Sequence, residues 1–390
     1  MRILLVHNYY RGGSPGGEDI VFESERALLE SAGHDVRVYT RHNDEMNEHR
    51  LRDRVSTALS VLGLGRTRDE LLSSFSAWRP DIVHVHNSFP LISRTVFDAC
   101  ATVGIPSVQT VHNYRWVCSA ATHVRDGRLC TECGPRDLSP AVRHRCYRGS
   151  LLGSIVIARA IRGEFVQRER GGGPSRYLAL TEFAAARMRA AGIDANRIRV
   201  RPNFIDPVPI AASRERYAVF TGKLAPEKGL HTLLAAWRAL PDIPLQIVGD
   251  GPVRRALQAE AQRLELKNVS FRGMQSREVT RHTVAAASLQ IVPSEWFEGM
   301  PMVVLEAWAA GTPVVASAIG GLAEMIGENE RGLVFTPGDA DALASRVRLL
   351  WNDARLCDAL TTAAIKHVHH HHSPEAALRS LTEIYSELLA

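Results

Sequence analysis

The sequence predicts an α/β protein built from two doubly wound, Rossmann-like domains. Short apolar, β-branched stretches alternate with amphipathic helical stretches through most of the 390 residues, which is typical of parallel sheets covered by helices. The pattern occurs twice, and a proline-rich segment at 201–209 separates the two occurrences. The length also exceeds what one hydrophobic core usually supports, which favours two domains.

The first domain is predicted to contain five strands, of which the first four are expected to be buried and parallel, with an amphipathic helix at 20–31 after the first of them. The strands are expected at 3–6, 35–39, 82–86, 107–111 and 177–180. The second domain repeats the alternation, with strands expected at 217–221, 245–248, 269–272, 289–292 and 312–316.

These elements set the expected domain bounds. The first domain covers 1–205 and carries a cysteine-containing insertion at 116–150, the second covers 206–373, and a helix at 374–390 is expected to pack back on the first. The connecting segment is placed near 205–213.

Composition excludes several classes of protein. With 45% hydrophobic and 23% charged residues the chain is neither disordered nor fibrous. The first apolar stretch is too short for a signal peptide, and no stretch is long enough to span a bilayer. We therefore expect a cytoplasmic protein that is either fully soluble or peripheral at the inner face of the membrane. The formal charge of +5 permits an anionic partner.

Lysine is scarce and concentrated near one turn. Only four of the 47 basic residues are lysine, and Lys223 and Lys228 lie five positions apart after the strand at 217–221. A loop that leaves a strand and enters a helix is a ready phosphate site, because free amides and the helix dipole favour anions. The alternative is a solvated turn with ordinary lysines.

Two acidic residues flank a second strand–loop–helix unit. Glu298 precedes Gly299 and Pro301, and Glu306 follows eight positions after Glu298. On one continuous helix the two would be separated by about 12 Å, which is beyond the roughly 5–9.5 Å of a glycosidase carboxylate pair. The spacing instead suits two hydroxyl-rich rings joined by a diphosphate.

Together these motifs resemble the retaining glycosyltransferases of family 4. The resemblance rests on the Glu298–Gly–x–Pro–x4–Glu306 motif, on Gly222–Leu224 with Lys228, on the glycine loop before Glu18, and on the 110–113 strand end. It covers nearly the whole chain. It implies a GT-B fold, in which two Rossmann-like domains face each other across a cleft, and a hexosyltransferase activity that uses a nucleotide-diphosphate sugar donor.

The resemblance also implies roles for individual residues. The proposed catalytic residues are Glu298 on the transferred sugar, His112 facing that sugar, and Lys228 on the diphosphate. The donor-binding residues it implies are Gly16, Gly17, Lys223, Lys228, Gly249, Met274, Glu298, Met302, Val303 and Glu306. Glu306 would hold the ribose. Lysines and the helix dipole would replace a catalytic metal, and no carboxylate nucleophile would be needed.

A separate cluster of cysteines follows His112. Cys118, Cys130, Cys133 and Cys146 have a spacing compatible with a tetrahedral structural zinc site, which would hold the long insertion in place. The alternative is four reduced thiols, with His123 or His144 as substitute ligands.

A basic stretch continues from the cysteines. Arginines between 143 and 170 fit an anionic membrane or a lipid diphosphate, or form a solvated face. The acceptor is expected to be a saccharide or lipid-linked, in polysaccharide or glycolipid synthesis, with no nucleic-acid partner. The two alternative functions are a nucleotide-cofactor oxidoreductase and a zinc-dependent nucleic-acid-binding protein.

Overall fold

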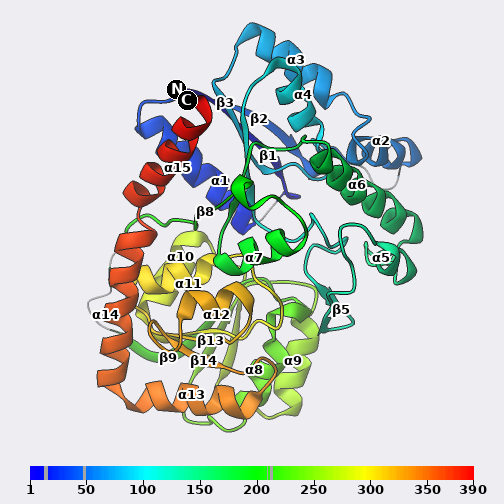
Figure 1. Cartoon of the computed structure of the whole chain (residues 1–390). Coiled ribbons are helices and arrows are strands. Elements are labelled where there is room, and N and C mark those ends of the chain that lie inside the picture. Colours follow the sequence, from blue (N-terminus) through cyan, green and yellow to red (C-terminus); the bar gives the residue numbers. More distant parts are fainter. Residues whose placement is uncertain (13–15, 47–49, 209, 211–213) are drawn as a thin grey trace. The chain divides into compact units, whose positions relative to one another are not determined.

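The computed structural model describes residues 1–12, 16–46, 50–208, 210 and 214–390 (Figure 1). The chain divides into two compact units. The first comprises Met1–His123, Cys130–Pro202 and Ala377–Ala390, and the second comprises Val124–Leu129 and Asn203–Ala376. Part of the connecting segment predicted at 205–213 lies outside the described residues.

The first unit is a parallel six-stranded sheet in the order β2-β1-β3-β4-β7-β8. Its strands are β1 Arg2–Tyr9, β2 Asp35–His42, β3 Ile82–Asn87, β4 Ser107–Val111, β7 Arg176–Ala179 and β8 Ile198–Val200. Its helices are α1 Gly17–Ser31, α2 Leu51–Val61, α3 Thr67–Ala77, α4 Thr95–Val103, α5 Ser139–Arg143, α6 Leu151–Glu169 and α7 Glu182–Ala190. The doubly wound prediction is confirmed for this unit.

The C-terminal helix α15 (Pro374–Leu389) joins the first unit's core. Leu381, Ile384 and Tyr385 on one face of α15 pack against Ile3 and Leu5 of β1. The helix thus covers the sheet with residues almost four hundred positions from the strand.

One strand differs from its prediction. We expected residues 35–39 to form a buried strand, but every position of β2 is exposed or only partly buried, and Val38 is exposed. The reason is its place in the sheet: β2 is the edge strand and pairs with β1 alone. The run of β-branched residues predicted the strand correctly and its burial wrongly.

The second unit is also a parallel six-stranded sheet, in the order β11-β10-β9-β12-β13-β14. Its strands are β9 Glu215–Thr221, β10 Leu245–Val248, β11 Val269–Gly273, β12 Ala287–Val292, β13 Val314–Ser317 and β14 Leu333–Phe335. Its helices are α8 Leu230–Trp237, α9 Arg254–Arg263, α10 Arg277–Ala286, α11 Met302–Ala309, α12 Gly320–Ile326, α13 Ala340–Asn352 and α14 Ala354–His371.

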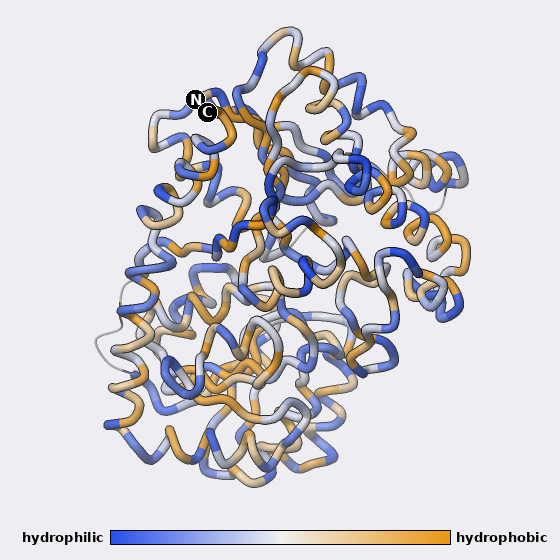
Figure 2. Tube along the Cα trace, viewed as in Figure 1, coloured by the Kyte–Doolittle hydropathy of each residue, from blue (hydrophilic) through white to orange (hydrophobic). Residues whose placement is uncertain are grey.

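Apolar residues concentrate in the strands of both sheets, while the helices alternate between apolar and polar faces (Figure 2). In the second unit, Trp237 of α8 and Leu343 of α13 are fully buried against Phe220 of β9 and the neighbouring strands. Because all the strands of a sheet run in parallel, their carboxyl ends meet along one edge. That edge is where ligands bind in open α/β sheets.

Candidate active site

The loop after β9 is held tightly against the loop after β12. Gly229 adopts φ +66°, and a Cβ atom there would lie 1.8 Å from the carbonyl oxygen of Pro293. Only glycine permits this approach. The packing of the two loops brings Lys228, at the end of one, next to Glu298 in the other.

Lys228 and Glu298 form the central ion pair of this edge. The Lys228 Nζ lies 2.6 Å from Glu298 Oε1, and the Ser294 hydroxyl donates to the same oxygen at 2.7 Å. Glu298 is only 5% exposed, and the ammonium lies 5.2 Å from the centre of the Trp296 ring. The pair therefore places a cation and a hydrogen-bond acceptor side by side, with the carboxylate largely shielded from solvent.

The amino end of α11 lies just beyond this pair in sequence. Met302 and Val303 are its first two residues, and the cap residue Pro301 provides no side-chain acceptor for the first amides. The first turn of the helix also contains no acidic residue. Uncapped amides and the positive end of the helix dipole together favour a bound anion.

Glu306 lies one turn further along α11, outside the loop that holds Glu298. Burial raises the pKa of Glu306, while the nearby guanidinium groups of Arg277 and Arg281 on α10 oppose the rise. The two carboxylates predicted from the sequence thus come from different elements, a loop and a helix. They also have different electrostatic partners.

The remaining residues predicted in this unit line the same edge. Gly249 follows β10, and a Cβ atom there would lie 1.9 Å from the carbonyl oxygen of Gly222 after β9. The amide of Gly249 donates to Gly273 at the end of β11. Met274 is 54% exposed, and Lys223 is exposed as well. The loops after three neighbouring strands therefore meet at one place.

In the first unit, the predicted glycines begin helix α1. Gly16 is the cap residue, and its amide donates to the Asp19 carboxylate at 2.8 Å. A phosphate at Gly16 would compete with that carboxylate. Gly17 is exposed, with open space where a side chain would lie.

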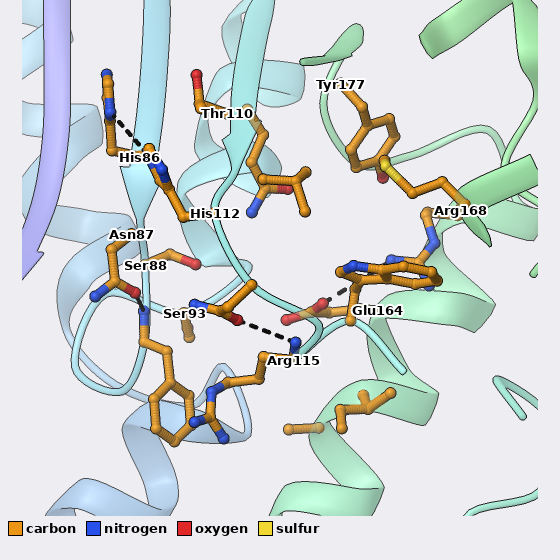
Figure 3. A pocket seen from close by; sticks show the side chains of 18 of the residues that line it. His86, Asn87, Ser88, Ser93, Thr110, His112, Arg115, Glu164, Arg168 and Tyr177 are labelled. Carbon is orange, nitrogen blue, oxygen red and sulfur yellow. Dashed lines mark hydrogen bonds and ion pairs between the residues drawn. The ribbon is translucent and has the colours of Figure 1, made fainter. Parts of the chain in front are cut away.

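His112 follows β4 and lines a pocket of the first unit (Figure 3). Its Nε2 lies 3.1 Å from Nδ1 of His86. Burial, and next the neighbouring His86, hold the pKa of His112 well below its usual value, so its ring is neutral. The pocket also contains Arg115, Glu164 and Arg168.

Two family models match the chain. The model of Glycosyltransferase Family 4 matches residues 16–208, and the model of Glycosyl transferases group 1 matches residues 204–367. The chain belongs to glycosyltransferase family 4. This glycosyltransferase has the expected GT-B architecture of two Rossmann-like domains, and the assignment supports neither the oxidoreductase nor the nucleic-acid-binding alternative.

The curated relatives of this glycosyltransferase include a glycogen synthase and a mannosyltransferase. The glycogen synthase of Mycobacterium tuberculosis is 26% identical over 411 residues, covering 93% of this chain and 89% of that protein. A GDP-mannose-dependent α-(1-6)-phosphatidylinositol monomannoside mannosyltransferase of Mycolicibacterium smegmatis is 34% identical over 191 residues, covering 44% of this chain and 48% of that protein.

Solved structures share the fold of the glycosyltransferase. Anabaena HepE, crystallised in complex with UDP, has 18% sequence identity and a TM-score of 0.68, covering 99% of this chain and 100% of that one. The sucrose-phosphate synthase of Thermosynechococcus elongatus gives a TM-score of 0.70 at 20% identity, covering 99% and 98%.

Sequence reasoning missed several partners of the predicted residues. It did not single out Ser294 beside Glu298, or Arg277 and Arg281 near Glu306. The two arginines lie four positions apart and hence on one face of α10. Their four-residue spacing could have indicated from the sequence that they form one basic face.

The four cysteines are all reduced and partly buried. Burial raises the pKa of Cys133 to about 11, and its neighbours Cys118, Cys146 and Cys130 add to the rise. Because the pKa of Cys133 is influenced by the other three thiols, Cys133 lies within electrostatic range of all three. The Cys133 sulfur also accepts a hydrogen bond from the backbone of Ala141, whose carbonyl accepts from the Cys146 amide.

Proposed function

We propose that this glycosyltransferase is a retaining enzyme that moves a sugar from a nucleotide-diphosphate donor to a saccharide or lipid-linked acceptor. The observation that carries the proposal is the Lys228–Glu298–Ser294 cluster next to the uncapped amino end of α11. The cation and the amides suit a diphosphate, and the carboxylate suits sugar hydroxyls as a hydrogen-bond acceptor.

In this proposal, each group of the donor has a partner of matching chemistry. The diphosphate binds Lys228, Lys223 and the amides of Met302 and Val303, while the ribose hydroxyls donate to Glu306. Glu298 accepts from hydroxyls of the transferred sugar. The backbone around Gly249 and Met274 lies beside the base, and family resemblance assigns Gly16 and Gly17 to the phosphates and His112 to the sugar.

Breaking the glycosyl phosphate bond gives an oxocarbenium-like sugar and a diphosphate that gains negative charge. Cations and amides already in place stabilise that charge without reorganisation, commonly the largest catalytic contribution. Glu298 is held by Lys228 and Ser294, which suits a carboxylate that binds hydroxyls better than one that attacks carbon. In a retaining reaction, the departing phosphate would assist deprotonation of the acceptor hydroxyl, which attacks the sugar from the face that the phosphate leaves.

The proposed acceptor side includes contact with an anionic membrane. Leu151 and Leu152 at the start of α6 are 46% and 70% exposed, and Arg145 and Arg148, close before them in sequence, are exposed as well. Apolar and basic side chains together favour an anionic lipid surface. In the described part of the chain, no helix has the length and apolarity needed to cross a bilayer.

We further propose structural zinc on Cys118, Cys130, Cys133 and Cys146. The backbone hydrogen bond to the Cys133 sulfur and the influence of the other three thiols on Cys133 support the proposal, and zinc binding would displace the thiol protons that burial favours. Bound zinc would cross-link the insertion. It is assigned no part in sugar transfer.

The donor is tested by calorimetry and thermal shift with UDP, GDP and their sugars, followed by NMR of the anomeric configuration of the product. The proposal requires that one diphosphate nucleotide bind wild type and fail to bind Glu306→Ala at the same concentration. It also requires that the product keep the donor's anomeric configuration. An inverted product overturns retention, and the absence of binding by every nucleotide overturns the donor site.

A further inference from the structure

The first unit contains a charged network with no exposure to solvent. Glu25 of α1 lies 3.0 Å from Nε2 of His86 and 2.9 Å from Nδ1 of His84, both through Oε1. Its other oxygen, Oε2, lies 2.6 Å from the Arg201 guanidinium. The hydroxyl of Tyr385 lies 2.6 Å from the His84 ring nitrogen. All five side chains are essentially fully buried.

Such a network is poorly explained by stability alone. Burying charges costs several kcal/mol per ion, and apolar replacements of similar volume are often as stable. The ligand atoms of Glu25, His84 and His86 lie within 4.8 Å of one another, a spacing that could hold a cation. Arg201 already supplies the compensating positive charge, so we assign the group to an ion network.

The charge of Glu25 fixes the hydrogen-bond direction at His86. Burial alone would raise the pKa of Glu25, but Arg201 and the two histidines hold it well below its usual value, so the group is a carboxylate. A carboxylate only accepts hydrogen bonds. Nε2 of His86 therefore carries the proton and donates.

The same reasoning fixes the direction of the hydrogen bond between His86 and His112. Burial lowers the pKa of His86 to about 4, so its ring is neutral and carries one proton. Since that proton is on Nε2, Nδ1 of His86 is an acceptor. It lies 3.1 Å from Nε2 of His112, which must donate. Nδ1 of His112 is then left without a proton.

We propose that Glu25 and His86 are positioning residues that hold His112 in its Nε2-protonated tautomer, so that Nδ1 accepts a hydrogen bond from a substrate hydroxyl. The assignment of the hydroxyl to a sugar rests on the proposed transferase function. His112 lines the pocket with Asn87 and Arg115 (Figure 3), and Asn113 belongs to the same lining. A neutral ring that presents a lone pair accepts from a hydroxyl and repels a phosphate oxygen.

The structure offers a matched pair of variants. His84 and His86 are both buried and both contact the same oxygen of Glu25, but of the two it is His86 that bonds to His112.

The Glu25→Gln variant is nearly isosteric with wild type. Because Arg201 requires an acceptor, the amide oxygen would face Arg201 and the amide nitrogen would donate to the histidines. The direction of each hydrogen bond from residue 25 through His86 to His112 would then reverse.

The test is the tautomer of His112, read from long-range ¹H–¹⁵N correlation spectra of the full chain labelled in histidine. We expect the Nε2-protonated form in wild type and in His84→Leu, and the Nδ1-protonated form in Glu25→Gln. His86→Leu should give a mixture of tautomers. A network that only stabilises the fold would leave the tautomer unchanged in all three variants.

The wild-type spectrum decides the proposal even if every variant fails to fold. An Nδ1-protonated or charged His112 in wild type at neutral pH overturns it. No substrate is needed for this measurement, so its failure is distinguishable from failure of the donor site, which the nucleotide titrations report.

Discussion

Lys228 and Glu298 lie seventy positions apart in sequence, yet their side chains meet at 2.6 Å between Nζ and Oε1. The two loops that carry them are pressed together at Gly229 and Pro293. Without a ligand, each residue neutralises the other. A bound donor would insert its diphosphate next to the ammonium and its sugar next to the carboxylate. Because the ion pair already holds the ammonium and the carboxylate in place, neither has to move far when the donor binds.

Replacing the lysine tests its role in charge stabilisation. Lys228→Ala should lower the rate of sugar transfer by about 100-fold or more, the usual cost of removing one preorganised partner of a developing negative charge. The far-ultraviolet circular dichroism should be unchanged. Lys267→Ala, at an exposed lysine of the same unit, serves as the control and should retain wild-type activity. Near-normal transfer by Lys228→Ala would contradict the assignment.

Glu306 should make nucleotide binding depend on pH. Its pKa is raised because burial disfavours the charged form, so the carboxylate is lost at a higher pH than for an exposed glutamate. Ribose hydroxyls need the carboxylate as an acceptor, and we expect nucleotide affinity to fall as the pH is lowered from neutral. Isothermal titration calorimetry across this range measures the effect.

The Glu306→Gln variant separates binding from stability. A neutral amide carries a smaller desolvation penalty than a buried carboxylate, so at neutral pH the free energy of unfolding should equal or exceed that of wild type. Nucleotide affinity should nevertheless fall about tenfold or more, because a hydrogen bond to a charged group is lost. Wild-type affinity that is independent of pH, or equal affinity in the variant, would argue against a ribose contact.

Much of the fold follows from sequence periodicity, and its failures have a physical pattern. The runs in β1 and β3 are buried as predicted. The burial of β2 could not be predicted because it depends on the order of strands in the sheet, which is set by contacts distant in sequence. Strands β8 and β14 were missed because three residues give too little periodicity.

The site shows the same division. Lys228 and Glu298 stand out in the sequence as a rare lysine and a loop acid, but their pairing arises from tertiary packing. His84 and His86 lie on one face of β3, and their common partner Glu25 is about sixty positions away on a helix. A histidine in a strand pattern gives no sign of a buried carboxylate beside it.

The close approach at Gly229 predicts an unusually harmful alanine substitution. Gly229→Ala would place Cβ 1.8 Å from the Pro293 oxygen, so the two loops must separate. Gly338→Ala is the matched control, because that glycine has φ +80° and no atom within 4 Å of the added Cβ. The control should lose about 1–2 kcal/mol from left-handed strain alone.

Denaturant unfolding measures both variants. Gly229→Ala should lose clearly more stability than Gly338→Ala, and it should also bind nucleotide more weakly because Lys228 moves with the loop. Equal losses in the two variants would mean that the loops separate at little cost. Unchanged nucleotide affinity in Gly229→Ala would uncouple this glycine from the site.

The cysteine cluster predicts a metal requirement for stability. If four thiolates of the insertion bind zinc, the purified protein should contain about one zinc per chain, and a chelator should lower its melting temperature because bound metal contributes to folding free energy. Cys133→Ser should reduce both the zinc content and the melting temperature. Cys357→Ser is the control, since that thiol donates to the Leu350 carbonyl in the second unit and is assigned no metal. Metal analysis with thermal unfolding decides between the alternatives. A metal-free wild type that melts at the same temperature with and without chelator would leave four reduced thiols, in an insertion held by its hydrogen bonds and by the packing of Leu138 against α6.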